Sequence, residues 1–175
     1  GYEVNRSLAA CEGALLVVDA TQGVQAQTLS NYHKARVLGL KIIPVLNKID
    51  LPVADVETTM LELIETFGFQ EKEMVAVSAK TGLNVEKILE KVVDLVPPPS
   101  GDETAALRAL IVTAKFDRHK GAIAYVRVVD GVLRKGEVLA FANNRRDFSP
   151  IEIGFFTPEM EARDEIRAGE VGYVC

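Results

Sequence analysis

Three polar residues at the end of an apolar run carry the most specific chemical signal in this chain. Asn47, Lys48 and Asp50 follow the stretch Lys41 to Leu46, which has the composition of a buried strand. A carboxylate such as Asp50 accepts two hydrogen bonds side by side, and guanine offers two adjacent donors whereas adenine does not. Because a buried carboxylate is costly to leave unpaired, such a loop rejects the wrong base strongly. The pattern predicts a guanine-reading loop, and the simpler alternative is a polar turn after a strand.

A second segment of this kind, Ser78-Ala79-Lys80, follows one helix and one strand later. Adjacent parallel strands end at the same edge of a sheet, so we expect both loops to meet one flat ligand. The backbone N–H of Ala79 would donate to the guanine carbonyl oxygen, and Lys80 would cover the ring or the ribose. Ser78 would brace Asp50 or its own loop. The alternative is a turn that leads into a helix, with Asn84 as the N-cap.

The first loop is assigned its remaining roles from side-chain chemistry. The amide of Asn47 can bond the base edge or pin a neighbouring loop, and the aliphatic stem of Lys48 can lie over the flat purine face. Asp50 discriminates guanine. The predicted nucleotide-binding residues are therefore Asn47, Lys48, Asp50, Ser78, Ala79 and Lys80.

No segment of the chain is of the type that cradles nucleotide phosphates. A GxxxxGKS/T loop does not occur in the 175 residues, and neither do the Mg²⁺-binding Ser or Thr of such a loop and the strand-end Asp that is followed by a glycine. His33 is expected on a helix surface and His119 in a turn between strands, so neither is assigned to catalysis. We expect the chain alone to bind nucleotide very weakly at most and not to hydrolyse GTP, and we assign it no catalytic or metal-binding residue.

Up to residue 98, short apolar runs alternate with amphipathic helical patterns. This alternation is typical of a parallel sheet covered by helices, in which ligands bind at the carboxyl ends of the strands. Asp19, Asn47 and Ser78 stand at those ends. The predicted strands are Ala14 to Asp19, Lys41 to Leu46 and Met74 to Ser78, and the predicted helices are Gln25 to Leu38, Val56 to Phe67 and Val85 to Leu95.

The proline run at residues 97–99 predicts a domain boundary, because three prolines cannot continue a helix. We expect one domain over residues 1–98 and a second over 99–175. The second part contains short β-type segments between glycine-bearing turns, which predict an all-β barrel. Its predicted strands are Ala109 to Lys115, Ile123 to Val129, Val138 to Ala142, Ile151 to Phe155 and Val171 to Cys175, and turns at Asp130-Gly131, Lys135-Gly136 and Asn143 to Arg146 fit hairpins.

Composition excludes several classes of protein. A hydrophobic content of 48% with 26% charged residues is ordinary for a soluble globular chain, and the net charge of −5 gives no overall attraction to nucleic acid. Cys11 and Cys175 show neither the spacing of a zinc site nor that of a disulfide framework, which favours a reducing cytosol. No apolar run approaches the roughly 18 residues that span a bilayer. The first residues read as the interior of a longer protein.

The motifs together resemble the LepA family of translational GTPases, the back-translocating elongation factors related to elongation factor G. The segment YEVNRSLAACEGALLVVDATQGVQAQT is similar to the region after the family's DTPGH-type segment, and NKID and SAKTG are similar to its base-specificity loops. PPPSGD and FDRHKGAIAYVRVVDGVLRKGE resemble the second domain of LepA proteins. GFFTP at Gly154 to Pro158 and AGEVGYV at Ala168 to Val174 favour LepA over elongation factor G or BipA.

This resemblance implies an α/β plus all-β fold: the distal half of a P-loop GTPase domain, followed by a translation-factor-type β-barrel. It implies a full-length GTPase with GTP or GDP, Mg²⁺, an upstream phosphate loop and a histidine that positions water. The implied partners are the ribosome and tRNA, with no DNA, and the implied role is back-translocation on elongating ribosomes. The implied location is the cytoplasm, with peripheral association at the inner face of the cell membrane.

Basic residues gather in three turns of the second part, where they suit contact with RNA phosphates. The alternative is that they keep exposed turns soluble and blunt sheet edges. The turns contain Arg118, His119 and Lys120, then Arg134 and Lys135, and finally Arg145 and Arg146.

The residues alone leave other functional classes open. Because the phosphate loop is missing, the chain could be a binding and interaction module without catalysis. It could also belong to another translational GTPase branch, such as elongation factor G or BipA. A third alternative is an unrelated α/β enzyme with fortuitous motifs, in which case the two base loops would lie far apart.

Overall fold

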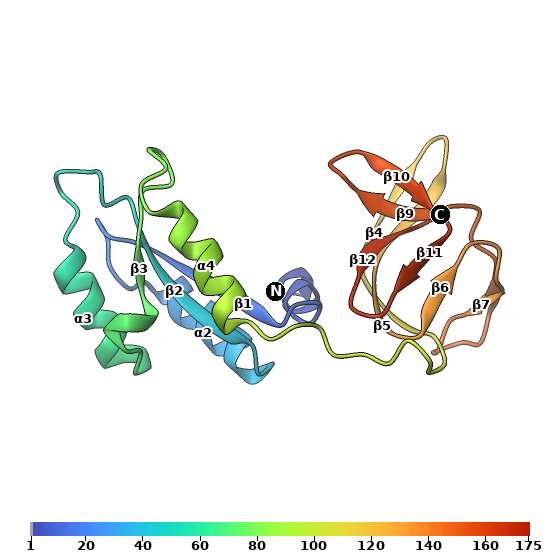
Figure 1. Cartoon of the computed structure of the whole chain (residues 1–175), viewed down its shortest axis with the longest axis horizontal. Coiled ribbons are helices and arrows are strands. Elements are labelled where there is room, and N and C mark those ends of the chain that lie inside the picture. The colour runs from blue at the N-terminus through green and yellow to red at the C-terminus, as the bar shows by residue number, and fades with distance from the viewer. Residues whose placement is uncertain (1) are drawn as a thin grey trace. The chain divides into compact units, whose positions relative to one another are not determined.

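The computed structural model describes residues 2–175, with side chains from Val4 onward, and divides them into two compact units (Figure 1). One unit is Cys11–Pro98, and the other is Pro99–Cys175 together with the residues up to Ala10. Helix α1 (Tyr2–Leu8) belongs to this second unit, where it lies against strand β4 (Arg108–Asp117). The units divide at the predicted proline run but group the first residues differently, and the assignment of domains 1–98 and 99–175 stays a prediction.

A three-stranded parallel sheet forms the centre of the first unit. Its order is β1-β2-β3, with β1 at Gly13–Asp19, β2 at Lys41–Asn47 and β3 at Val75–Ala76. The central strand β2 is buried from Ile42 to Leu46, as expected for a strand covered on both faces. Pairing of β1 with β2 sets Asp19 directly opposite Asn47, so two polar residues end side by side.

Helices pack on both faces of this sheet, although Leu15 and Val17 of the edge strand β1 remain exposed. Helices α2 (Ala26–Val37) and α3 (Val56–Phe67) pack on one face, and α4 (Val85–Leu95) packs on the other. The predicted parallel sheet with flanking helices is confirmed, and α3 and α4 have the predicted bounds. The first core contains Leu16, Val18, Tyr32, Ala35, Ile42, Leu46, Leu63 and Met74, and the second contains Ile43, Val45, Val75 and Val77.

Local chemistry fixes the ends of two helices. The Asp55 carboxylate accepts a hydrogen bond from the backbone N–H of Thr58 at 2.9 Å, which caps the start of α3. The helix stops at Gly68, whose φ of 74° is the left-handed conformation that glycine adopts easily. Asn84 stands at the N-cap position of α4 as expected, but its side-chain amide donates to the carbonyl of Ala76 at 2.9 Å instead of capping the helix. Asn84 thereby ties the start of α4 to β3.

The connection between α3 and β3 contains a short 3-10 helix, η1 (Glu71–Glu73), that the sequence did not predict. Its first turn is closed by the Glu73 carboxylate, which accepts from the backbone N–H of Gln70 at 2.9 Å. Among residues 2–175, no helix combines the length and the apolar character needed to cross a membrane.

Antiparallel strands build the second unit, which confirms the predicted β domain. A five-stranded sheet has the order β10-β9-β12-β5-β4, and β11-β6 and β7-β8 form two-stranded ribbons. The core is made by Val126, Val128, Leu133, Ile153, Ile166 and Val174. The strands after β4 are β5 (Gly121–Asp130), β6 (Val132–Arg134), β7 (Leu139–Ala140), β8 (Asp147–Phe148), β9 (Ile153–Phe156), β10 (Met160–Arg163), β11 (Glu165–Arg167) and β12 (Val171–Val174).

Several details of the β domain differ from expectation. Strands β6, β8, β10 and β11 were not predicted, because each contains only one or two apolar residues between polar ones and so shows no clear strand pattern. The turns at Asp130-Gly131 and Lys135-Gly136 were wrongly predicted to close hairpins. The first turn joins β5 to β6, and the second joins β6 to β7. Neither closes a hairpin, because β6 pairs with β11 and β7 pairs with β8. The turn at Asn143 to Arg146 does close the β7–β8 hairpin.

Two leucines of α3 test this packing. Leu63 is 0% exposed in the core, whereas Leu61 on the same helix is 53% exposed. Replacing Leu63 by Ala should lower the free energy of unfolding by about 2–5 kcal/mol, because it leaves a cavity. The matched control Leu61→Ala should cost no more than about 0.5 kcal/mol. Urea denaturation followed by far-ultraviolet circular dichroism measures both, and equal losses would contradict the packing described.

Candidate functional site

The carboxyl ends of the parallel strands bring three loops to one edge of the sheet. They follow β1, β2 and β3, whose last residues are Asp19, Asn47 and Ala76. Backbone hydrogen bonds hold the second and third loops together: the N–H of Val77 donates to the carbonyl of Leu46 at 2.8 Å, and the N–H of Ile49 donates to the carbonyl of Val77 at 3.3 Å. The two predicted base loops therefore adjoin, as a shared ligand requires.

The Asn47 side chain joins these two loops directly. Its Oδ1 accepts hydrogen bonds from the backbone N–H of Lys48 at 2.8 Å and from that of Ala79 at 3.0 Å. Of the two roles expected for Asn47, base contact and loop bracing, bracing is the contact present in the structure. The N–H of Ala79, which was expected to donate to the guanine carbonyl, is directed at Asn47, so a bound base would share this donor or take it over.

Ser78 shapes the second base loop from within. It is fully buried, its Oγ accepts from the backbone N–H of Thr81 at 3.1 Å, and its own N–H donates to the carbonyl of Leu83 at 3.0 Å. Between the two alternatives of bracing Asp50 or its own loop, the observed contact is with its own loop. Ser78 thus fixes the turn that presents Ala79 and Lys80 to solvent.

Asp50 presents its carboxylate to solvent. It lies in a turn closed by the N–H of Leu51, which donates to the carbonyl of Lys48 at 3.1 Å, and its side chain is exposed. Within the described part of the chain, this carboxylate makes no hydrogen bond or ion pair. Two adjacent acceptors at the rim of two joined loops fit the paired donors of guanine.

Lys48 is held by a contact that the sequence did not predict. Its Nζ lies 2.6 Å from Oδ2 of Asp19, and its backbone has a φ of 69°, which is uncommon for a residue other than glycine. Oδ1 of Asp19 accepts from the backbone N–H of Thr21 at 2.9 Å and from its Oγ1 at 2.7 Å. Bonding to Lys48, followed by the two bonds from Thr21, lowers the pKa of Asp19 from 3.8 to about 2. The signal that could have revealed the pair is the β1–β2 register, which sets Asp19 beside Asn47.

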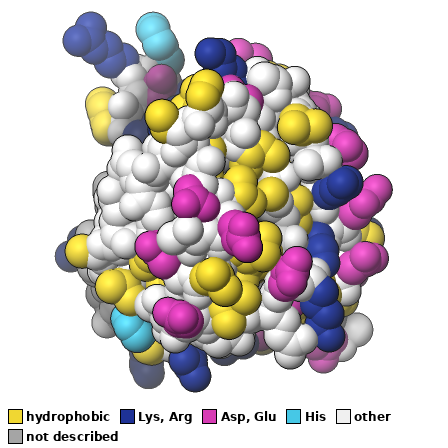
Figure 2. Space-filling model, turned by 90° about the vertical axis from the view of Figure 1, so that its left-hand side faces the viewer, with side chains coloured by type: hydrophobic (Ala, Val, Ile, Leu, Met, Phe, Trp, Pro, Cys, Tyr) yellow, Lys and Arg dark blue, Asp and Glu magenta, His cyan; other side chains and the backbone are white. Residues whose placement is uncertain are grey.

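The surface of the first unit at the end carrying α3 is not uniformly charged. Figure 2, turned toward this end, shows hydrophobic side chains in a band across the face with acidic and basic side chains beside them. Exposed apolar residues in this part of the chain include Leu51 and Val53, just after Asp50, and Leu61 on α3.

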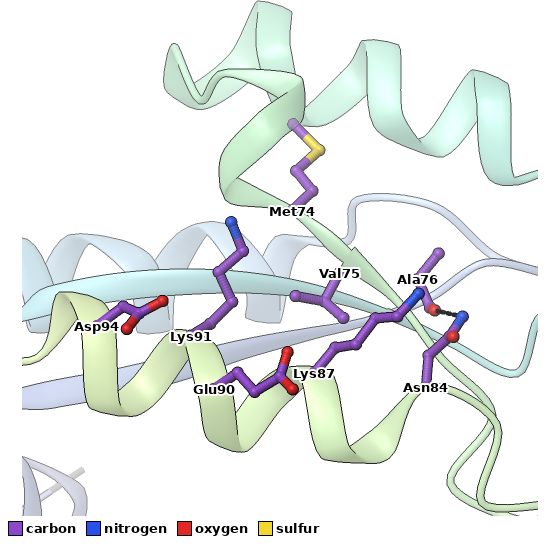
Figure 3. A pocket seen from close by; sticks show the side chains of 8 residues that line it. All are labelled: Met74, Val75, Ala76, Asn84, Lys87, Glu90, Lys91 and Asp94. Atoms are coloured by element: carbon purple, nitrogen blue, oxygen red, sulfur yellow. Dashed lines mark hydrogen bonds between the residues drawn. The ribbon is translucent and has the colours of Figure 1, made fainter.

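A separate hollow of about 350 Å³ lies beside the edge strand β3 (Figure 3). Lys87 and Lys91 project over it from α4, and the Nζ of Lys91 also bonds the carbonyl of Lys72. None of the six predicted nucleotide-binding residues lines this hollow, so it is distinct from the site at the strand ends. Its lining consists of Met74, Val75, Ala76, Asn84, Lys87, Glu90, Lys91 and Asp94.

The basic turns of the β domain differ in how their charges are used. Lys120 forms an ion pair with Glu152 at 2.5 Å, and Arg134 lies 3.8 Å from both Glu137 and Glu165. The residues Arg118, Arg145 and Arg146 are exposed and, within residues 4–175, form no ion pair. Lys135 is likewise exposed and forms no ion pair within residues 4–175, so the charges of these three arginines and of Lys135 are directed to solvent.

The low pKa of Asp19 predicts a pH dependence of stability. Because the folded pKa of about 2 lies below the ordinary value of 3.8, the carboxylate stabilises the fold fully above that ordinary value and loses this contribution as the pH falls toward 2. Asp19→Asn should remove the contribution, so the variant should lose less stability than the wild type between about pH 5 and pH 2.5. Urea denaturation across this range measures it, and identical pH slopes would refute the pairing.

The sequence of the chain matches a known protein family. Residues 1–98 match the family model described as Elongation factor Tu GTP binding domain. Elongation factor 4 of Desulfitobacterium hafniense is 51% identical over 174 residues, which are 99% of this chain and 29% of the relative. Elongation factor 4 of Leptospira biflexa is 52% identical over 173 residues, with the same shares. The chain thus spans under a third of the length of these relatives.

A solved structure supports the fold. The crystal structure of translation elongation factor SelB from Methanococcus maripaludis, in its apo form, aligns with a TM-score of 0.77 at 20% identity. The alignment covers 95% of this chain and 36% of that one, and at this identity it bears on the fold alone. The resemblance to LepA proteins is confirmed by the curated relatives. The chain belongs to the family of the elongation factor Tu GTP binding domain, and the relatives that it matches along almost all of its length are elongation factor 4 proteins.

Proposed function

We propose that this chain supplies the guanine-reading half of a GTP-binding domain, with an adjoining β domain, in a ribosome-associated translation factor that hydrolyses GTP. The observation that carries the proposal is the bridge from Asn47 Oδ1 to the backbone N–H groups of Lys48 and Ala79. This bridge joins the NKID and SAK loops, and the accessible carboxylate of Asp50 stands beside it. One base can therefore meet residues from both loops.

Each reading residue has a role that follows from its chemistry. Asp50 accepts hydrogen bonds from the ring N–H and the exocyclic amine of guanine, and the N–H of Ala79 donates to the carbonyl oxygen of the base. The aliphatic stems of Lys48 and Lys80 cover the ring or ribose. Asn47 and Ser78 brace the loops that carry these groups.

Phosphate and Mg²⁺ binding are placed elsewhere in the full-length protein, because no GxxxxGKS/T loop occurs in these 175 residues. GTP or GDP would contact this chain through base and ribose. In the full-length factor, GTP would hold a conformation that binds the ribosome, and hydrolysis would release it. The family role carried over is back-translocation on elongating ribosomes.

Contact with ribosomal RNA is proposed for the basic turns of the β domain. Arg118, Lys135, Arg145 and Arg146 suit phosphate contact best, because their charges are directed to solvent. Lys120 and Arg134 already neutralise carboxylates within the domain. Contact with tRNA, a cytoplasmic location and peripheral association with the inner face of the cell membrane belong to this proposal as family features.

Base specificity is the sharpest test of the assigned site. In the full-length protein, Asp50→Asn should weaken GTP binding by about tenfold or more and improve binding of xanthosine triphosphate, since an amide offers a donor where the carboxylate offered an acceptor. Isothermal titration calorimetry with both nucleotides measures the change. Asp94→Asn, at an exposed carboxylate on α4, is the matched control and should leave both affinities unchanged. Unaltered GTP affinity in Asp50→Asn would defeat the assignment.

The isolated chain tests a second candidate function, a binding module without catalysis. The sequence lacks a phosphate loop, so we expect very weak nucleotide binding at most and no turnover. Phosphate release would be measured with and without ribosomes, using the full-length factor as the positive control. Robust hydrolysis by the 175 residues alone would show that they contain a phosphate site of another kind.

A further inference from the structure

We infer that Asp19 is a positioning residue of the guanine site: it fixes Lys48 so that the stem of this lysine forms a preset surface for the purine. The inference rests on the proposed function, because it assigns Lys48 to a bound base. Asp19 lies on β1, which contributes none of the six residues proposed to bind nucleotide. It would act through Lys48 without touching the ligand.

Lys48 is tied at both ends. Its backbone N–H donates to Oδ1 of Asn47 at 2.8 Å, and its Nζ lies 2.6 Å from Oδ2 of Asp19. The side chain therefore runs from the end of β2 to the end of β1, while 49% of its surface remains exposed. A stem held at both ends and open along its length is suited to carry a flat ring.

The Asp19 carboxylate divides its two oxygens between separate tasks. Oδ1 accepts both hydrogen bonds from Thr21 and so shapes the turn after β1. Oδ2 is the oxygen that faces Lys48. The side chain of Asp19 is only 21% exposed, so its orientation is fixed before Lys48 is added. Because the tasks fall on different atoms, a substitution can change one and keep the other.

The ion pair with Asp19 determines which part of the Lys48 side chain is available to a ligand. A lysine ammonium is a compact charge on a flexible stem, and it would ordinarily seek an anion wherever one is in reach. Asp19 already neutralises this ammonium at the end of β1, so Lys48 presents its methylene groups to the ligand. Ordering the stem beforehand also reduces the conformational entropy that binding would otherwise cost.

The test is Asp19→Asn in the full-length protein. An amide can keep its oxygen toward Thr21 while removing the negative charge opposite Lys48. We expect the dissociation constant for GDP, measured by calorimetry, to rise by about two- to tenfold, which is the range for one side chain that loses its preset order. Preference for GDP over xanthosine diphosphate should be unchanged, since Asp50 is intact. The matched control Asp94→Asn, at an exposed carboxylate on α4, should leave the dissociation constant unchanged.

A double-mutant cycle separates positioning from a general structural effect. Lys48→Met keeps an apolar stem without an ammonium, and it should weaken GDP by a factor similar to that of Asp19→Asn. In the Lys48→Met background, Asp19→Asn should cause no further change. The inference would be overturned if the two substitutions together raised the dissociation constant by the product of their separate factors. It would also be overturned if Asp19→Asn alone left the dissociation constant unchanged. If Asp50→Asn still switches base preference in that case, the proposed function stands and only the role of Asp19 fails.

Discussion

Burial of strand β2 on both faces is the constraint on which the first unit depends. From Ile42 to Leu46 the strand is buried, so helices must cover it on both sides of the sheet and neighbouring strands must lie on both its edges. Polar side chains are excluded until the strand leaves the core, and Asn47 is the first residue at which a polar side chain meets the surface. The base loop therefore starts where burial ends, and parallel pairing brings the ends of β1 and β3 to the same place.

In the proposed site, the residues that brace the loops differ from the residues proposed to contact the base. Ser78 is buried, and Asn47 and Asp19 are partly buried. Their side chains accept hydrogen bonds from backbone N–H groups of the protein. Asp50 and Lys80 are exposed on the turns that these contacts shape. Precision at a loop site comes from such supporting contacts, because an exposed side chain alone cannot keep its orientation.

Sequence patterns predicted those parts of the fold whose signal lies in consecutive residues. Helices α3 and α4 have periodic apolar faces and were placed to the residue, and the two base loops were expected to adjoin. Strands such as β10 and β11 carry too few apolar residues to be recognised and exist because a partner strand pairs with them. The Asp19–Lys48 contact and the use of the Ala79 N–H by Asn47 depend on strand register and side-chain direction, which spacing along one chain does not reveal.

At Lys48, the backbone conformation favours glycine, whereas the contact with Asp19 requires a lysine side chain. Its φ of 69° is a conformation that glycine adopts freely and that costs other residues about 1 kcal/mol or more. Glycine would relieve the backbone but would remove the stem and the ammonium that reaches Asp19. The conformation of Lys48 is therefore retained by contacts outside its own backbone: the ion pair with Asp19 offsets the local cost of the positive φ. Glycine at position 48 would remove both the backbone cost and this stabilising contact, so it offers no clear gain in stability.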